Sequence, residues 1–215
     1  MIRLYTFFRS SAAFRVRIAL NLKGIAYEPA FVHLRKNEQR APEYLALNPE
    51  GLVPLLLIDG LRLTQSLAIA EYLDETRPAP PLLPKAPAAR ARVRALAEAI
   101  ACDIHPIDNL RVLRYLSRSF KAGDAEIAAW FMHWVDLGLD AVEAQLASAP
   151  ETGRFCHGDA PSLADLCLVP QIFNALRYDK DPLSRRPRIK RAFESAMALD
   201  AFERARPENQ PDFEA

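Results

Sequence analysis

The chain has 215 residues, half of them hydrophobic, so it can form one large domain or two small ones with a sizeable core. Its formal net charge of +1 gives no electrostatic reason to expect a nucleic acid or an anionic membrane as a partner. No apolar run is long enough to span a membrane, and the N-terminal MIRLYTFF lacks the pattern of a secretory signal peptide.

The first 80 residues alternate between short apolar runs and helical stretches. Residues 2–8 and 26–34 have the composition of β-strands. Residues 52–64 contain two apolar runs around Asp59-Gly60, which is a strong signal for a hairpin turn. Strands, helices and a hairpin in this order predict a small α/β domain.

Residues 11–23 are ambiguous between a strand and a helix. Apolar residues occupy every second position from Phe14 to Leu22, and this period of two favours a strand. Against that, a serine before the segment suits a helix N-cap, and Gly24 suits the position after a helix C-terminus. The pattern alone favours the helix only slightly.

Two short motifs surround the predicted hairpin. Val53-Pro54 opens its first strand, either as ordinary strand punctuation or as a turn that leaves the main chain of Val53 free for a peptide-like ligand. Gln65-Ser66 follows the second strand, and Ser66 is a plausible N-cap for a helix over residues 67–76. A helix N-terminus with free amides and a hydroxyl also suits a carboxylate.

The composition changes near residue 80. Residues 77–90 are rich in proline and predict a linker. Beyond it, apolar residues recur at every third or fourth position, as in helices. We therefore predict a first domain over residues 1–80 and an all-helical second domain over residues 88–215. Ser162 and Asp165 have the spacing of a capping box, which predicts the start of the last long helix.

Residues 102–116 predict a helix with a proline inside it. Pro106 removes one helical hydrogen bond and should kink the axis. His105 and Asn109 would share one face of this helix. A kinked helix with polar residues on one face can line a cleft, although a lone histidine on a helix is more often structural.

The cysteines and histidines do not have the spacing of a metal site. The three cysteines are Cys102, Cys156 and Cys167, and no two of them form a CxxC pair. An odd number of separated cysteines is typical of a reduced protein with free thiols, so we predict a cytoplasmic location. We expect no bound metal, because the four histidines form no ligand pattern either.

These pieces together resemble the zeta class of glutathione transferases along nearly the whole chain. The resemblance is carried by FFRSSAAFRVRIALNLKG (7–24), ALNPEGLVPLLLIDG (46–60), LTQSLAIAEYL (63–73), CDIHPIDNLRVLRYL (102–116) and GDAPSLADLCLVPQ (158–171). It implies a thioredoxin-like α/β N-terminal domain in which residues 11–23 are a helix, and an all-α C-terminal domain. It also implies a homodimer with glutathione as the cofactor.

The resemblance implies that glutathione is bound by Ser10, Ser11, Gln39, Val53, Pro54, Gln65, Ser66, His105 and Asn109. Ser10 and Ser11 match the serines of the family's SSC motif, beside the glutathione sulfur, while Ala12 stands where that motif has cysteine. We expect Ser10 to donate to the sulfur and Ser11 to cap the helix. Arg15 and Arg17 are expected to be structural.

Other positions match the parts of the tripeptide. Gln39 falls where a polar residue meets the glycine end, and Val53, before Pro54, would pair main chain to main chain with the cysteinyl unit. Gln65 and Ser66 would hold the γ-glutamyl carboxylate.

The helical domain is expected to contribute His105 and the stretch from Asn109 to Arg111, which would face the cleft. A dicarboxylate substrate also needs cations, and the guanidinium group matches a carboxylate geometrically. Arg9, Arg111 and Arg177 are therefore the candidate substrate clamp.

The resemblance implies that glutathione-dependent cis-trans isomerisation converts maleylacetoacetate into fumarylacetoacetate. Three alternatives stay open. One is the isomerisation of maleylpyruvate, and another is general glutathione conjugation or dehalogenation. The third is a non-catalytic transferase-like binding module, which the presence of the serine, VP and QS motifs disfavours.

Overall fold

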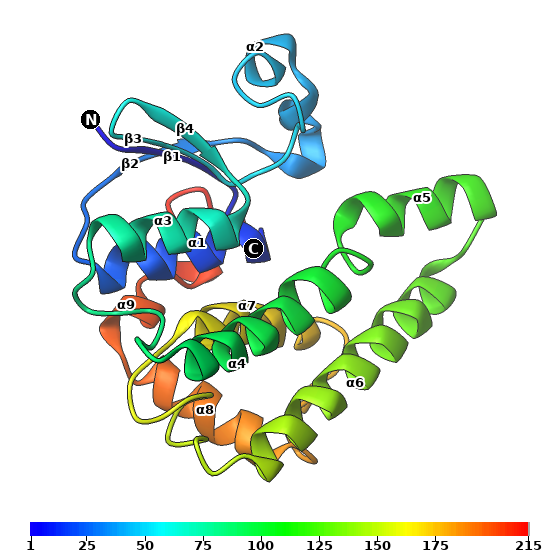
Figure 1. Cartoon of the computed structure of the whole chain (residues 1–215). Helices are drawn as coiled ribbons and strands as arrows, with labels where there is room; N and C mark the ends of the chain where they lie inside the picture. Colours follow the sequence, from blue (N-terminus) through cyan, green and yellow to red (C-terminus); the bar gives the residue numbers. More distant parts are fainter. Residues whose placement is uncertain (215) are drawn as a thin grey trace. The chain divides into compact units, whose positions relative to one another are not determined.

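A computed structural model describes residues 1–214 and divides the chain into two compact units. One unit contains residues 1–82 together with the C-terminal segment from residue 197, and the other contains residues 83–196. Figure 1 shows the four strands in the first unit and only helices in the second. No helix that the structure describes is long and apolar enough to cross a membrane.

The first unit is built on a four-stranded mixed sheet with the order β2-β1-β3-β4. The strands are β1 (Arg3–Thr6), β2 (Glu28–Phe31), β3 (Leu55–Ile58) and β4 (Leu61–Thr64). β1 runs parallel to β2, whereas β3 runs antiparallel to both β1 and β4. This small mixed sheet with its helices confirms the predicted thioredoxin-like α/β fold.

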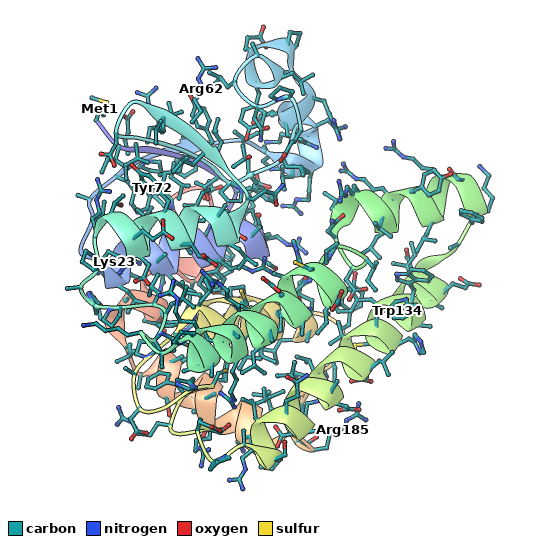
Figure 2. All side chains as sticks on the ribbon, viewed as in Figure 1. Met1, Lys23, Arg62, Tyr72, Trp134 and Arg185 are labelled. Carbon is teal, nitrogen blue, oxygen red and sulfur yellow. The ribbon has the colours of Figure 1, made fainter. Side chains whose placement is uncertain are left out.

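The helices of the first unit are α1 (Ser11–Leu22), α2 (Pro42–Leu45), α3 (Ser66–Thr76) and α9 (Asp200–Glu203). α1 and α3 lie side by side against the sheet (Figure 1). Lys23, which follows α1 and is labelled in Figure 2, donates from Nζ to Asp74 Oδ1 of α3 at 2.7 Å. This ion pair is almost fully buried and fixes the two helices to each other.

The ambiguous segment 11–23 is a helix, as the resemblance implies. It begins after Ser10 and ends at Lys23, and Gly24 follows with the left-handed φ of +64° that favours glycine. The helix α1 is buried on nearly all sides, including at Arg15 and Arg17. Its apolar residues are therefore not confined to one face with a period of 3.6, which explains why the period of two was misleading.

The predicted hairpin is confirmed. Asp59 and Gly60 have φ of +53° and +78°, and the left-handed conformation at both positions is what a tight two-residue turn requires. The strand predicted over 26–34 forms only at Glu28–Phe31.

The second unit is entirely helical, as predicted. Its elements are α4 (Pro87–Glu98), a π-helical segment (Ala99–Ile104), α5 (Leu110–Phe120), α6 (Asp124–Ser148), α7 (Leu163–Ala175) and α8 (Pro187–Met197). Ser162 caps α7 with the predicted capping box, since Asp165 Oδ2 accepts from both the main-chain amide and the hydroxyl of Ser162 at 2.8 Å.

The prediction of one kinked helix over residues 102–116 is wrong. The π-helical segment ends at Ile104, and a new helix begins at Leu110 after a turn. Pro106 lies in this turn, where its missing amide hydrogen breaks no helical ladder. Asn109 caps the new helix, because its Oδ1 accepts from Arg111 N at 3.0 Å. His105 and Asn109 therefore do not share a helix face.

The C-terminal segment from residue 197 packs with the first unit, whereas the second domain predicted over residues 88–215 included it. Asn21 Nδ2 of α1 donates to Ala201 O at 2.9 Å, and Phe8 N donates to Asp212 Oδ2 at the same distance. These bonds connect the chain from residue 197 onward to the first unit.

Arg17 connects the β1–α1 turn to the C-terminal segment from a fully buried position. Its guanidinium donates to Thr6 Oγ1 at 3.1 Å and to Phe8 O at 3.0 Å, and its Nε donates to Ala205 O at 3.1 Å. Burial lowers the pKa of Arg17 to about 10, so the group remains a cation at neutral pH.

We predict that Arg17→Met lowers the free energy of unfolding by about 3 kcal/mol or more, because it leaves several buried acceptors without a donor. Urea unfolding at neutral pH measures the loss. Arg3→Met is the matched control, since it removes a partly exposed pair with Glu28 that contributes less than about 1 kcal/mol. An equal loss in both variants would contradict the proposed role of Arg17.

Candidate functional site

Four loops of the first unit leave the sheet at the same end. In the β-ladder Thr6 at the end of β1 pairs with Phe31 at the end of β2, and Tyr5 pairs with Leu55 at the start of β3. Leu55 in turn pairs with Thr64 at the end of β4. The turn after β1, the loop after β2, the loop before β3 and the turn after β4 therefore meet there. These loops carry all the site residues predicted in the first domain.

The turn after β1 starts α1 with two serines in different roles. Ser10 is the N-cap, with an extended backbone and an Oγ that accepts from Ala13 N at 3.2 Å. Ser11 is the first helical residue and is 7 % exposed. Its hydroxyl makes no hydrogen bond within residues 1–214. The expectation that Ser11 caps the helix is therefore wrong, because the extended backbone that a cap needs is at Ser10.

This turn can stabilise a thiolate. The N-terminus of α1 carries the positive end of the helix dipole, and its cap accepts hydrogen bonds while its own hydroxyl proton remains available as a donor. Ala12 supplies no thiol of its own here. Arg9 lies just before the cap and is half-buried, so a cation adjoins the same turn.

The loop before β3 presents an unpaired stretch of main chain. Asn48 Nδ2 donates to Leu52 O at 2.8 Å and the Tyr44 hydroxyl donates to the same oxygen, which fixes the loop. The Val53-Pro54 bond is cis. The amide and carbonyl of Val53 make no hydrogen bond within the described chain, although the residue is buried. Such groups need a partner, and an extended peptide can provide it.

Gln39 lies against this loop. A Cβ on Gly51, whose φ is +60°, would lie 2.9 Å from the carbonyl oxygen of Gln39. The side-chain Oε1 of Gln39 is buried and accepts no hydrogen bond within the described residues. A donor from a bound ligand would satisfy this acceptor.

The turn after β4 starts α3 without a capping side chain. Gln65 precedes the helix with φ of +64°, and Ser66 is the first helical residue. Ser66 is therefore not the predicted N-cap of a helix at 67–76. Its Oγ accepts instead from Arg15 Nη1 at 3.2 Å. The first amides of α3 lack an internal acceptor, which makes this helix end suitable for a carboxylate.

Two charged residues at this turn were missed by sequence reasoning. Arg15 contacts Ser66 from 51 positions earlier in the chain, and Glu50 Oε2 accepts from Gln65 Nε2 at 3.1 Å. Arg15 was expected to have a structural role, and Glu50 has no distinguishing signal in the sequence. Only the packing of α1 against α3 and the fold of the loop before β3 reveal these contacts.

The second unit carries the predicted site residues of the turn at residues 105–109. His105 is half-buried there, and Asn109 has its side-chain oxygen engaged as the cap of α5. Asp108 is buried between them, and burial raises the pKa of its carboxyl to about 7. This carboxyl is therefore partly neutral near pH 7.

The two candidate arginines of this unit are both exposed. Arg111 is the second residue of α5. Arg177 follows α7, where its Nη1 donates to Asn174 Oδ1 at 2.9 Å and its guanidinium lies 5.3 Å from the centre of the Tyr178 ring. Arg177 is thus oriented by its neighbours.

The described chain has no group of three or more histidine, cysteine or acidic residues that could hold a metal ion. All three cysteines are free, with Cys102 exposed and Cys156 and Cys167 buried.

Comparison with known families identifies both parts of the chain. Residues 1–75 match the family described as the N-terminal domain of glutathione S-transferase, and residues 124–195 match the family described as its C-terminal domain.

Individual relatives match over nearly the full length. A probable maleylacetoacetate isomerase of Vibrio cholerae is 50 % identical over 97 % of both chains. The holo structure of a maleylpyruvate isomerase, described as a bacterial zeta-class glutathione S-transferase, is 48 % identical with a TM-score of 0.95, over 99 % of this chain and 100 % of the other. The structure of a maleylacetoacetate isomerase from Methylobacterium extorquens, with bound malonate and glutathione, is 46 % identical with a TM-score of 0.94 and the same coverage.

Proposed function

Because this chain belongs to the zeta class of glutathione S-transferases, we propose that it is a glutathione-dependent cis-trans isomerase that converts maleylacetoacetate into fumarylacetoacetate. The observation that carries the proposal is the capped turn at Ser10, which offers a site for a thiolate but no protein thiol. The family resemblance also supports a homodimer, and the free cysteines support a reducing, cytoplasmic setting.

The residues of the first unit fit an extended tripeptide. The unpaired main chain of Val53, before Pro54, would bind the cysteinyl unit, and the unsatisfied oxygen of Gln39 would accept from the glycine end. Gln65 and Ser66, with the free amides of α3, would hold the γ-glutamyl carboxylate. Ser10 would then lie at the sulfur. We assign His105 and Asn109 to the part of the cofactor and substrate that faces the second unit.

When bound, glutathione supplies a thiolate whose reversible addition turns the double bond of the substrate into a single bond that can rotate. Ser10 would donate a hydrogen bond from its hydroxyl to the sulfur, and the N-terminus of α1 would favour the negative charge. The Ser11 hydroxyl, which has no partner within residues 1–214, makes a second contribution. Together these groups would favour the deprotonated thiol at neutral pH.

The substrate is a dianion, so its carboxylates need cations. Arg9 in the first unit and Arg111 and Arg177 in the second are our candidates. In the Methylobacterium extorquens relative, malonate and glutathione are bound together, which supports a dicarboxylate as the second ligand here.

The activity itself is tested with both cis substrates, maleylacetoacetate and maleylpyruvate, with and without glutathione. We expect isomerisation that requires glutathione and is faster with maleylacetoacetate. Maleylpyruvate is the second candidate substrate, because a maleylpyruvate isomerase is 48 % identical to this chain. Faster turnover of generic electrophiles would favour a general transferase. Glutathione binding without any turnover would favour a binding module.

We predict that Ser10→Ala raises the pKa of bound glutathione toward the value of about 8.5 for a free thiol, because the sulfur loses a hydrogen-bond donor. We expect kcat/KM for isomerisation to fall about tenfold or more. The ultraviolet absorbance of the thiolate, followed against pH, measures the pKa.

Two further variants serve as controls for the role of the Ser10 hydroxyl. Ser10→Thr keeps both the hydroxyl and the cap and should retain the low thiol pKa. Ser11→Ala should have a smaller effect on the pKa than Ser10→Ala. An unchanged pKa and turnover in Ser10→Ala would show that another group stabilises the thiolate.

We also predict that replacing Arg9, Arg111 or Arg177 by methionine raises KM about tenfold for a dianionic substrate, and much less for a neutral electrophile, because a charged hydrogen bond is lost. Arg118→Met, at the other end of α5, is the matched control on an exposed arginine. Equal changes in KM for charged and neutral substrates would exclude the clamp.

A further inference from the structure

A tight turn that ends at Ser10 joins β1 to α1. Ser10 N donates to Phe7 O at 3.0 Å, which closes the turn directly before the helix. Phe8 lies inside the turn, and its main-chain carbonyl and amide are both bound by side chains from outside it. Phe8 O accepts from Arg17 Nη2 at 3.0 Å, and Phe8 N donates to Asp212 Oδ2 at 2.9 Å. One anchor of the turn therefore comes from α1 and the other from the C-terminal segment.

The two side chains that bind the main chain of Phe8 are of opposite charge type. Arg17 is fully buried, and Asp212 is half-buried. Burial raises the pKa of the Asp212 carboxyl, while the hydrogen bond from Phe8 N and the positive charge of Arg17 oppose that rise. The negative charge of Asp212 in turn favours the cationic form of Arg17. The two anchors of the turn therefore stabilise each other.

The residues that follow Asp212 hold it in place. Phe213 packs edge-to-face on Phe8, with 5.5 Å between the ring centres. Glu214 Oε2 accepts from Arg35 Nη2 at 2.8 Å, and Arg35 lies in the loop after β2. The C-terminal segment is thus bound to two of the loops that form the candidate site. Within this segment, Asp212 is the residue that contacts the main chain of the turn after β1.

We infer that Asp212 is a positioning residue for the Ser10 hydroxyl, and that it acts through the main chain of Phe8. Phe8 is 1 % exposed, so its amide would have no water to replace the carboxylate of Asp212. Without that acceptor the turn would rearrange to satisfy the amide. Ser10 follows Phe8 by two residues, so such a rearrangement would displace its hydroxyl. The inference rests on the proposed role of Ser10 at a thiolate, and it adds a residue from the far end of the chain.

The test variant is Asp212→Ala, which removes the acceptor of Phe8 N. We expect the pKa of bound glutathione to rise and kcat for isomerisation to fall about tenfold, while KM changes less, because the hydroxyl is misaligned but the other binding groups remain. Ultraviolet absorbance of the thiolate against pH measures the pKa. Hydrogen exchange followed by NMR needs no ligand, and it should show the Phe8 amide exchanging about tenfold or more faster than in the wild-type protein.

Two further variants assign the effect to the hydrogen bond. Asp212→Asn keeps a side-chain oxygen that can accept from Phe8 N, so kcat and the exchange rate of the Phe8 amide should lie within about threefold of the wild-type values. Glu208→Gln is the matched control in the same C-terminal segment. Its carboxylate is exposed and pairs with Arg206, so its removal should leave the thiol pKa and the exchange of Phe8 unchanged.

A lower free energy of unfolding in Asp212→Ala, with an unchanged thiol pKa and unchanged exchange of the Phe8 amide, would overturn the inference. If Asp212→Ala does not fold, Asp212→Glu takes its place, because it keeps the carboxylate but moves it by one methylene. Wild-type pKa and exchange in that variant would overturn the inference equally. Absence of glutathione binding by the wild-type protein would refute the proposed function, whereas unchanged Phe8 exchange in the variants would refute the role of Asp212, so the two failures are distinguishable.

Discussion

The candidate site depends on one buried cation, Arg17, more than on any other side chain of the first unit. Its guanidinium binds Thr6 at the end of β1, the carbonyl of Phe8 in the following turn and the carbonyl of Ala205 near the C-terminus. No local helix signal fixes the path of the chain between β1 and Ser10. The position of the Ser10 hydroxyl therefore depends on a side chain seven residues later, and on a C-terminal segment that packs with the N-terminal unit.

Two helix N-termini at one end of the sheet have different chemistry. α1 is capped by its own Ser10, so its end stabilises charge through the dipole and a hydroxyl proton. α3 has no capping side chain, and its Ser66 is held by Arg15, so its end offers free amides with a cation behind them. The first arrangement suits a thiolate and the second a carboxylate. A ligand that carries both groups, joined by an extended peptide beside Val53, uses both ends at once.

Local signals predicted the parts of the fold that depend on neighbouring residues. Asp59-Gly60 specified its hairpin, because the turn needs two left-handed residues in succession. Ser162 caps its helix as predicted, but the caps expected at Ser11 and Ser66 lie one residue earlier, because sequence does not reveal which residue has the extended backbone of a cap. The break at residues 105–109 was missed for a related reason, because Asn109 caps a new helix instead of continuing the old one. The contact between Arg15 and Ser66 could not be predicted from local signals, because the two residues lie 51 positions apart.

Ala12 determines whether the first turn of α1 has a protein thiol. A cysteine at this position would place a protein thiol in the first turn of α1, where the same dipole would favour its thiolate. With alanine there, the described residues of the first unit contain no cysteine, because Cys102, Cys156 and Cys167 all belong to the second unit. The first unit therefore has no thiol of its own for this helix end, and in the proposed function the thiolate is that of glutathione.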